Sequence, residues 1–284
     1  MGYRNFRQGF RALKPFAVGP ITQERLAPET GNSESTWDSE FQEGCELNIK
    51  NLNGQTVSKI QHHGMRVMQL TRLAIQELYT EGIDRYGAFI RFFRSRQAIQ
   101  ALLQGSDLLR PGLRVLDAGC GFGTVTFALL EGLRQKNFNY QGVDAFDLTP
   151  AMLARFQQTL ETHGITRVQL RQADVLALET LPPSWTDYDL ILSASMLEYL
   201  PRPELPRVLE VMRARLAPGG HILVVITRKV PETKALIQWW WQAERYTAKE
   251  LRRTFEQAGF HYPVFRRFPR RYFWLNRANY VIEA

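Results

Sequence analysis

The stretch VLDAGCGFGT, residues 115–124, lies where an apolar run meets an amphipathic one. The residues RVLDAG (114–119) predict a short buried strand, and TVTFALLEGLRQ (124–135) predicts a helix. Between them, Gly119, Gly121 and Gly123 allow the backbone to turn tightly and to approach a ligand closely. The first turn of the following helix offers free backbone amides. The stretch therefore predicts a ligand-binding loop between a strand and a helix.

The alternation of strands and helices continues to the end of the chain. Further strands are predicted over 140–147, 168–174, 189–195 and 219–227, and PVFRRF and NYVIEA are expected to form a terminal pair. Helices are predicted over 149–164, in PELPRVLEVMRARL and over 247–260. Thr149 suits the N-cap of the first of these helices, and Gly164 suits its end. The pattern predicts an α/β fold with a doubly wound, mostly parallel, seven-stranded sheet.

The part of the chain before residue 109 has a different texture. Residues 1–54 are rich in polar residues and lack periodicity, so we expect a flexible or irregular arm. Apolar residues recur at helical spacing over 56–79 and 84–104, which predicts a helical extension over 55–108. The main domain is then expected over 109–284, with an insert at 228–246 after the fifth strand.

Composition limits the class of protein. The 284 residues are 44% hydrophobic and 23% charged, as in ordinary globular proteins. No run approaches the roughly 18 apolar residues of a membrane span, and the first ten residues lack the apolar core of a secretory signal. With only Cys45 and Cys120, we expect no disulfide framework and a cytoplasmic location.

The net charge of +8 is concentrated in two segments. Residues 1–23 contain four basic residues and 261–280 contain five arginines, neither with an acid, so these segments carry 4 + 5 = 9 charges and the rest carries −1. Such segments favour an anionic partner, such as a membrane, a nucleic acid or a phosphorylated substrate, although solvated arginines are equally consistent with them.

Six motifs in order resemble one family, the class I methyltransferases that use S-adenosylmethionine. After VLDAGCGFG come DLTPAML (147–153), QADVLAL (172–178), YDLILSASMLEYL (188–200), LAPGGHILV (216–224) and YTAKELRRTFEQAGF (246–260). A dinucleotide site would instead need a glycine at Thr124. The resemblance covers residues 109–284 and implies a Rossmann-like sheet with S-adenosylmethionine as the cofactor.

The resemblance also implies roles for individual residues. The backbone of the loop formed by Gly119, Cys120, Gly121 and Gly123 is expected to hold the methionine part, with Asp117 near its ammonium group and Ser193 beside it. Asp174 and the Val175 amide are expected at the adenine, with Leu148 against its ring. For the two ribose hydroxyls, Asp144 and Asp147 compete, and they face opposite sides of a strand. We favour Asp147 because it lies two residues before the helix N-cap.

Methyl transfer needs a positioned nucleophile, and a general base only where the nucleophile must lose a proton. Glu198 and Tyr199, just after the fourth strand, are the candidate catalytic residues, and a structural role for them stays open. No metal-ligand cluster is evident in the sequence, so no metal is expected.

The insert contains three consecutive tryptophans, Trp239 to Trp241. We expect Trp239, Trp240 and Tyr246 to contact the substrate, with packing of the insert or membrane contact as the alternatives for the tryptophans. SMLEYLP is closest to methyltransferases of small molecules, quinones and lipids, so an apolar or aromatic small molecule is the expected acceptor. An RNA- or protein-directed methyltransferase, or a non-catalytic binding module, is the alternative. Nucleic acid is an unfavoured partner, and peripheral contact with an anionic membrane is an open one.

Overall fold

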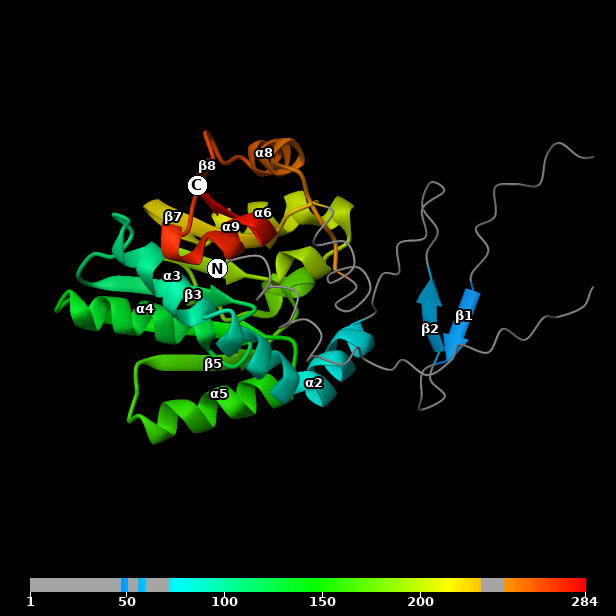
Figure 1. The fold of residues 1–284 in the computed structure, drawn as a ribbon, viewed down its shortest axis with the longest axis horizontal. Helices are drawn as coiled ribbons and strands as arrows, with labels where there is room; N and C mark the ends of the chain where they lie inside the picture. The colour runs from blue at the N-terminus through cyan, green and yellow to red at the C-terminus, as the bar shows by residue number, and fades with distance from the viewer. Residues whose placement is uncertain (1–46, 51–55, 60–71, 231–242) are drawn as a thin grey trace, which may run out of the picture. The chain divides into compact units, whose positions relative to one another are not determined.

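The computed structural model describes residues 47–50, 56–59, 72–230 and 243–284 (Figure 1). The chain divides into two units, residues 1–69 and 70–284. In the first unit, β1 (Leu47–Lys50) pairs with antiparallel β2 (Thr56–Lys59). The predicted helix over 56–79 is therefore wrong at its start, where Thr56 and Val57 are β-branched and favour a strand. Trp239 to Trp241 lie outside the described residues.

The second unit is built on a seven-stranded sheet of order β5-β4-β3-β6-β7-β9-β8. Its strands are β3 (Leu113–Ala118), β4 (Tyr140–Asp147), β5 (Val168–Gln172), β6 (Tyr188–Ala194), β7 (Leu216–Thr227), β8 (Val264–Arg266) and β9 (Asn279–Glu283). The first five are mutually parallel, and β9 runs antiparallel to both β7 and β8. From β3 the chain adds β4 and β5 on one side of the sheet and then β6 and β7 on the other. Ligands of doubly wound sheets bind at this switch point, beside β3.

Helices cover both faces of this sheet, as alternate residues of β4 illustrate. Ala145 packs in one core cluster with side chains of α4 (Thr124–Gln135) and α5 (Pro150–Thr162). Phe146 packs in another with side chains of α6 (Leu205–Arg213) and α8 (Ala248–Gln257). Neighbouring residues of a strand face opposite sides, so the two clusters lie on opposite faces. The predicted doubly wound α/β fold is confirmed.

Two helices precede β3, and they differ from the predicted ones. Helix α2 spans Arg72–Phe92 and α3 spans Ser95–Gln104, so the helix predicted over 84–104 is interrupted. Arg94 lies between them in a left-handed conformation, with φ of 53°, which a continuous helix does not allow. Asp84 of α2 forms an ion pair with Arg155 of α5 (2.8 Å), and Gln76 donates to the carbonyl of Leu148 (2.8 Å). These contacts hold α2 against the end of β4.

The C-terminal part contains the predicted helix α8 and two short elements that the sequence patterns did not predict. α8 begins with a capping box, in which Thr247 and Glu250 each accept the other's backbone amide. The turn η5 (Arg270–Tyr272) and helix α9 (Phe273–Ala278) then connect β8 to β9. Both are shorter than the window over which helical periodicity can be recognised. Among the described residues, no helix is long and apolar enough to cross a membrane.

Candidate active site

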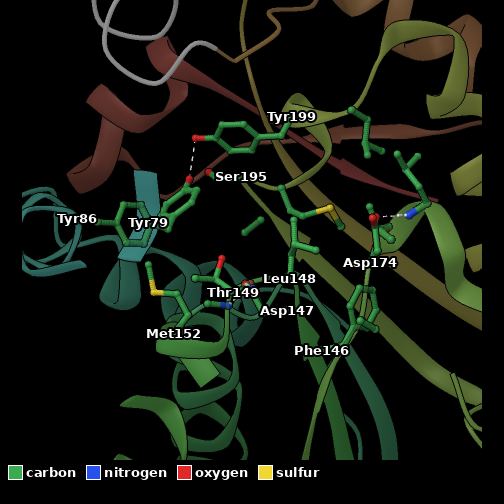
Figure 2. A pocket seen from close by; sticks show the side chains of 18 of the residues that line it. Tyr79, Tyr86, Phe146, Asp147, Leu148, Thr149, Met152, Asp174, Ser195 and Tyr199 are labelled. Carbon is green, nitrogen blue, oxygen red and sulfur yellow. Dashed lines mark hydrogen bonds between the residues drawn. The ribbon is translucent and has the colours of Figure 1, made fainter. Parts of the chain in front are cut away.

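A cavity of about 250 Å³ lies at the carboxyl ends of β3, β4 and β6 (Figure 2). Its walls come from the glycine loop, the ends of β4 and β6, the turns η1 (Val175–Thr180) and η2 (Leu197–Tyr199), and helices α2 and α5. The lining residues are Tyr79, Tyr86, Gly119, Gly121, Phe146, Asp147, Leu148, Thr149, Met152, Ala173, Asp174, Val175, Leu176, Ala194, Ser195, Met196, Tyr199, Leu200 and Pro201. Apolar and aromatic residues therefore surround a few polar groups, as in typical ligand sites.

The glycine loop uses its glycines in different ways. Gly121 lines the cavity, has φ of 52°, and a Cβ placed on it would contact nothing within 4 Å. Gly123 begins α4 with φ of 89°, and a Cβ there would overlap the ring of Phe156. Gly121 thus leaves open space for a ligand near the backbone, whereas Gly123 allows α4 to pack closely on α5.

The two acids of β4 lie in different environments. Asp147 lines the cavity, where its two carboxylate oxygens accept from the backbone amides of Gly121 and Thr149, each at 2.8 Å. Burial raises its pKa above the ordinary value, and these amide hydrogen bonds oppose the rise. Asp144 instead accepts from the Tyr188 hydroxyl (2.8 Å) and pairs with Arg114 (3.1 Å). Of the two, only Asp147 lines the cavity.

Asp174 follows β5 and lines the cavity opposite the tyrosines, as Figure 2 shows. One oxygen of its carboxylate accepts from the amide of Leu176 at 2.8 Å, which fixes the start of η1. Leu148, Val175 and Leu176 add apolar surface beside it. This part of the cavity therefore joins an oriented carboxylate to a flat apolar wall.

Four of the residues expected at the cofactor do not line the cavity: Asp117, Cys120, Gly123 and Ser193. Asp117 is fully buried and accepts from both the amide (3.1 Å) and the hydroxyl (2.6 Å) of Thr126, which ties β3 to the first turn of α4. Burial raises the pKa of Asp117 to about 7. Its Oδ1 atom has no hydrogen-bond partner among the described residues. Ser193 is buried within β6, and Ala194 and Ser195 line the cavity after it.

Three tyrosines form the other side of the cavity, on the left of Figure 2. Tyr79 and Tyr86 come from α2, and Tyr199 comes from η2. The Tyr79 hydroxyl donates to the Tyr199 hydroxyl at 2.7 Å, and the ring of Tyr79 packs edge to face on the other two rings. Burial raises the pKa of all three hydroxyls further above neutral pH, where a tyrosine is already protonated.

Sequence patterns did not identify Tyr79 and Tyr86 as site residues. They are seven residues apart, which places them on one face of a helix two turns apart. That spacing is a recognisable signal for a shared face, but it does not say which strand end the face covers. Met152 and Met196, which also line the cavity, were not identified from the sequence either.

Two further predicted residues, Glu198 and Tyr246, are buried and do not line the cavity. The Oε1 atom of Glu198 accepts from the Thr227 hydroxyl at 2.9 Å, whereas its Oε2 has no hydrogen-bond partner among the described residues. Burial raises the pKa of Glu198 to about 7. Tyr246 is buried beneath the guanidinium of Arg202, which lies 4.6 Å from its ring centre. Trp239 and Trp240 are outside the described residues. Within the described chain, no three His, Cys, Asp or Glu side chains group as metal ligands.

The strand order, the glycine loop and the acid ending β4 define the class I S-adenosylmethionine-dependent methyltransferases. Residues 89–262, more than half of the chain, match the family described as methyltransferase domain. The chain belongs to this family.

Individual proteins of known sequence or structure agree with that assignment. The carboxy-S-adenosyl-L-methionine synthase of Chromohalobacter salexigens is 33% identical over 139 residues, which are 49% of this chain and 47% of that protein. The ubiquinone biosynthesis O-methyltransferase of Marinobacter nauticus is 29% identical over 125 residues, 43% of this chain and 47% of that protein. The chain thus spans about half the length of these curated relatives.

A solved structure shows the same fold. It is the magnesium protoporphyrin IX methyltransferase of Synechocystis PCC 6803 with bound S-adenosylhomocysteine, which matches with a TM-score of 0.55 at 16% identity. The match covers 75% of this chain and 98% of that one.

Proposed function

We propose that this protein transfers the methyl group of S-adenosylmethionine to a small, apolar or aromatic acceptor. The observation that carries the proposal is the composition of the cavity, which has the carboxylates of Asp147 and Asp174 in one part and three tyrosines in another. The carboxylates suit the hydroxyl and amino groups of the cofactor, and the aromatic rings suit a flat or apolar acceptor.

The residues present fit S-adenosylmethionine. A carboxylate has about four lone-pair sites, and Asp147 uses one on each oxygen for Gly121 and Thr149. One site per oxygen remains for two ribose hydroxyls. We propose that Asp174 and the Val175 amide bind the adenine edge, with Leu148 against the ring, because all three line the same wall. The open space at Gly121 favours close approach of the methionine part to the loop.

Four of the residues expected at the cofactor would support the cavity wall from behind. They are Asp117, Cys120, Gly123 and Ser193. Asp117 holds the start of α4 through Thr126. Its buried Oδ1 has no hydrogen-bond partner among the described residues, but Asp117 lies behind the cavity wall, so its contact with the cofactor's ammonium group stays a prediction. The other three are small residues packed in the loop or in β6, where they shape the cavity wall without lining it.

The tyrosines would orient the acceptor. Because Tyr79 donates to Tyr199, the proton of Tyr199 is left to donate to an oxygen or nitrogen of a bound molecule. Tyr79 and Tyr86 precede residue 89, where the family match begins, so two of the three tyrosines come from the chain's own helical extension. This supports the proposal that α2, within the predicted extension over 55–108, is part of a substrate cap.

The bound cofactor supplies an activated methyl group on a good leaving group, and positioning is the main task left to the protein. Alignment of reacting groups can contribute roughly 7–11 kcal/mol. Tyr199 is a poor general base because burial raises its pKa. We propose that Tyr199 contacts the acceptor and that Glu198 positions η2 from behind. The Glu198 carboxylate accepts from Thr227, and its backbone carbonyl accepts from the amide of Glu244 at 2.7 Å. Substrate contacts by Trp239, Trp240 and Tyr246, and a cytoplasmic location, remain predictions.

The experiment is transfer of labelled methyl groups from S-adenosylmethionine to separate metabolite, lipid, RNA and protein fractions, with Asp147→Ala as the matched control. We expect label in the metabolite or lipid fraction that depends on Asp147. Label found only in RNA or protein would contradict a small-molecule acceptor and favour a macromolecular one.

A further inference from the structure

Two basic segments that are far apart in sequence contact each other in the folded chain. Residues 85–106 contain four arginines and 257–282 contain five, giving 4 + 5 = 9, and neither segment contains an acid. The indole nitrogen of Trp274 in α9 donates to the carbonyl of Phe93, between α2 and α3, at 3.3 Å. Figure 1 shows α9 in red beside α3 in teal. The fold thus brings into contact two arginine-rich segments that are far apart in the sequence.

Two phenylalanines are exposed where these segments meet. Phe92 is 57% exposed and Phe273 is 51% exposed, which is unusual for large apolar side chains. Each ring packs edge to face on its neighbour in the chain, Phe92 on Phe93 (5.1 Å between centres) and Phe273 on Trp274 (5.6 Å). Trp274 links both pairs through its bond to Phe93. The exposed rings are therefore held in place by ordered neighbours.

Three exposed arginines lie within three residues of these phenylalanines in the chain. Arg94, Arg270 and Arg271 are exposed, and none of them forms an ion pair within the described chain. By contrast, Arg266 is paired with both carboxylate oxygens of Glu283. We name Phe92, Arg94, Arg270, Arg271 and Phe273 the basic-aromatic surface.

We propose that the basic-aromatic surface binds the surface of an anionic lipid membrane. Guanidinium groups match phosphate geometry, and each basic residue near such a membrane adds favourable attraction. Phenylalanine adds apolar area without a hydrogen-bonding group, which suits the boundary between headgroups and acyl chains. This inference is independent of the methyl acceptor, because none of the five residues lines the cavity.

The test is co-sedimentation of the full chain with phosphatidylcholine vesicles and with vesicles that also contain phosphatidylglycerol. We expect binding only to the anionic vesicles. The double variant Arg270→Gln/Arg271→Gln should weaken it about 25-fold, at about fivefold per arginine, and Phe92→Ser/Phe273→Ser should weaken it by roughly tenfold or more. The matched control, Arg171→Gln/Arg253→Gln, removes two other exposed arginines and should leave binding unchanged.

Three outcomes would overturn the proposal. One is equal binding, or none, to both kinds of vesicle. Another is an equal loss of binding in the control and the Arg270→Gln/Arg271→Gln variant. The third is a loss of affinity for a labelled single-stranded RNA in the surface variants while vesicle binding is unchanged, which would assign the surface to nucleic acid. All substituted side chains are exposed, and a thermal melt of each variant checks that it is folded.

Discussion

At the scale of single residues, the cavity separates side chains that bind from side chains that support. Asp147 and Asp174 line it, whereas Asp117 and Glu198 are buried behind it, each with one oxygen lacking a hydrogen-bond partner among the described residues. Burial raises the pKa of both buried acids to about 7. Since the folded state then holds these protons more tightly than the unfolded chain, each ionised group costs stability at higher pH.

Glu198→Gln tests this cost. The pKa of Glu198 is about 7 when folded against 4.5 in the unfolded chain, so the wild type loses stability as pH rises between these values. The glutamine variant avoids that loss and can still accept from Thr227. Relative to wild type, its free energy of unfolding should improve by roughly 2 kcal/mol between pH 5 and pH 8, measured by urea denaturation. Exposed Glu256→Gln is the control, and the same pH trend in both variants would refute this explanation.

The residue scale also shows what sequence could and could not predict at the site. The spacing from the helix N-cap favours Asp147 over Asp144, and Asp147 is the one that lines the cavity. Tyr79 and Tyr86 precede the glycine loop by more than thirty residues in the chain, and only the docking of α2 through Gln76 and Asp84 brings them to it. Local patterns carry no information about such docking.

At the scale of elements, the loop between β3 and α4 combines binding and packing. Gly121→Ala should cost roughly 1 kcal/mol of stability, because residue 121 has a left-handed backbone. It should also weaken S-adenosylhomocysteine binding, because the methyl group of alanine would enter the open space beside the loop. Gly123→Ala should cost roughly 3 kcal/mol or more, because its methyl group overlaps Phe156. Thermal melts with and without ligand separate the two effects. Equal losses of both stability and affinity in the two variants would be inconsistent with this division.

Element boundaries were predictable where local signals agree. α5 begins after Thr149 with Pro150 at its first position and ends before Gly164, as expected. The break between α2 and α3 was not predicted, because Arg94 in a left-handed conformation has no sequence signature comparable to glycine. The strand Thr56–Lys59 lies in a segment for which the sequence predicts a helix, because the apolar residues downstream recur at helical spacing.

At the scale of the whole molecule, the order of strand and helix patterns was sufficient to predict the doubly wound sheet. The strand patterns alone do not specify which strands are neighbours, so the order within the sheet was not predicted. The meeting of the two arginine-rich segments is a property of the folded molecule alone, since it depends on the contact between α9 and the α2–α3 junction.

The most direct test of the central claim is isothermal titration of S-adenosylhomocysteine into the full chain, its Asp147→Ala variant and its Asp144→Ala variant. We predict that wild type binds one equivalent and that Asp147→Ala binds roughly tenfold or more weakly, since it loses charge-assisted hydrogen bonds to the ligand. Asp144→Ala should keep the affinity, because Asp144 bonds to Tyr188 and Arg114 away from the cavity. No binding by wild type, or a greater loss in Asp144→Ala than in Asp147→Ala, would contradict the assignment of this cavity to the cofactor.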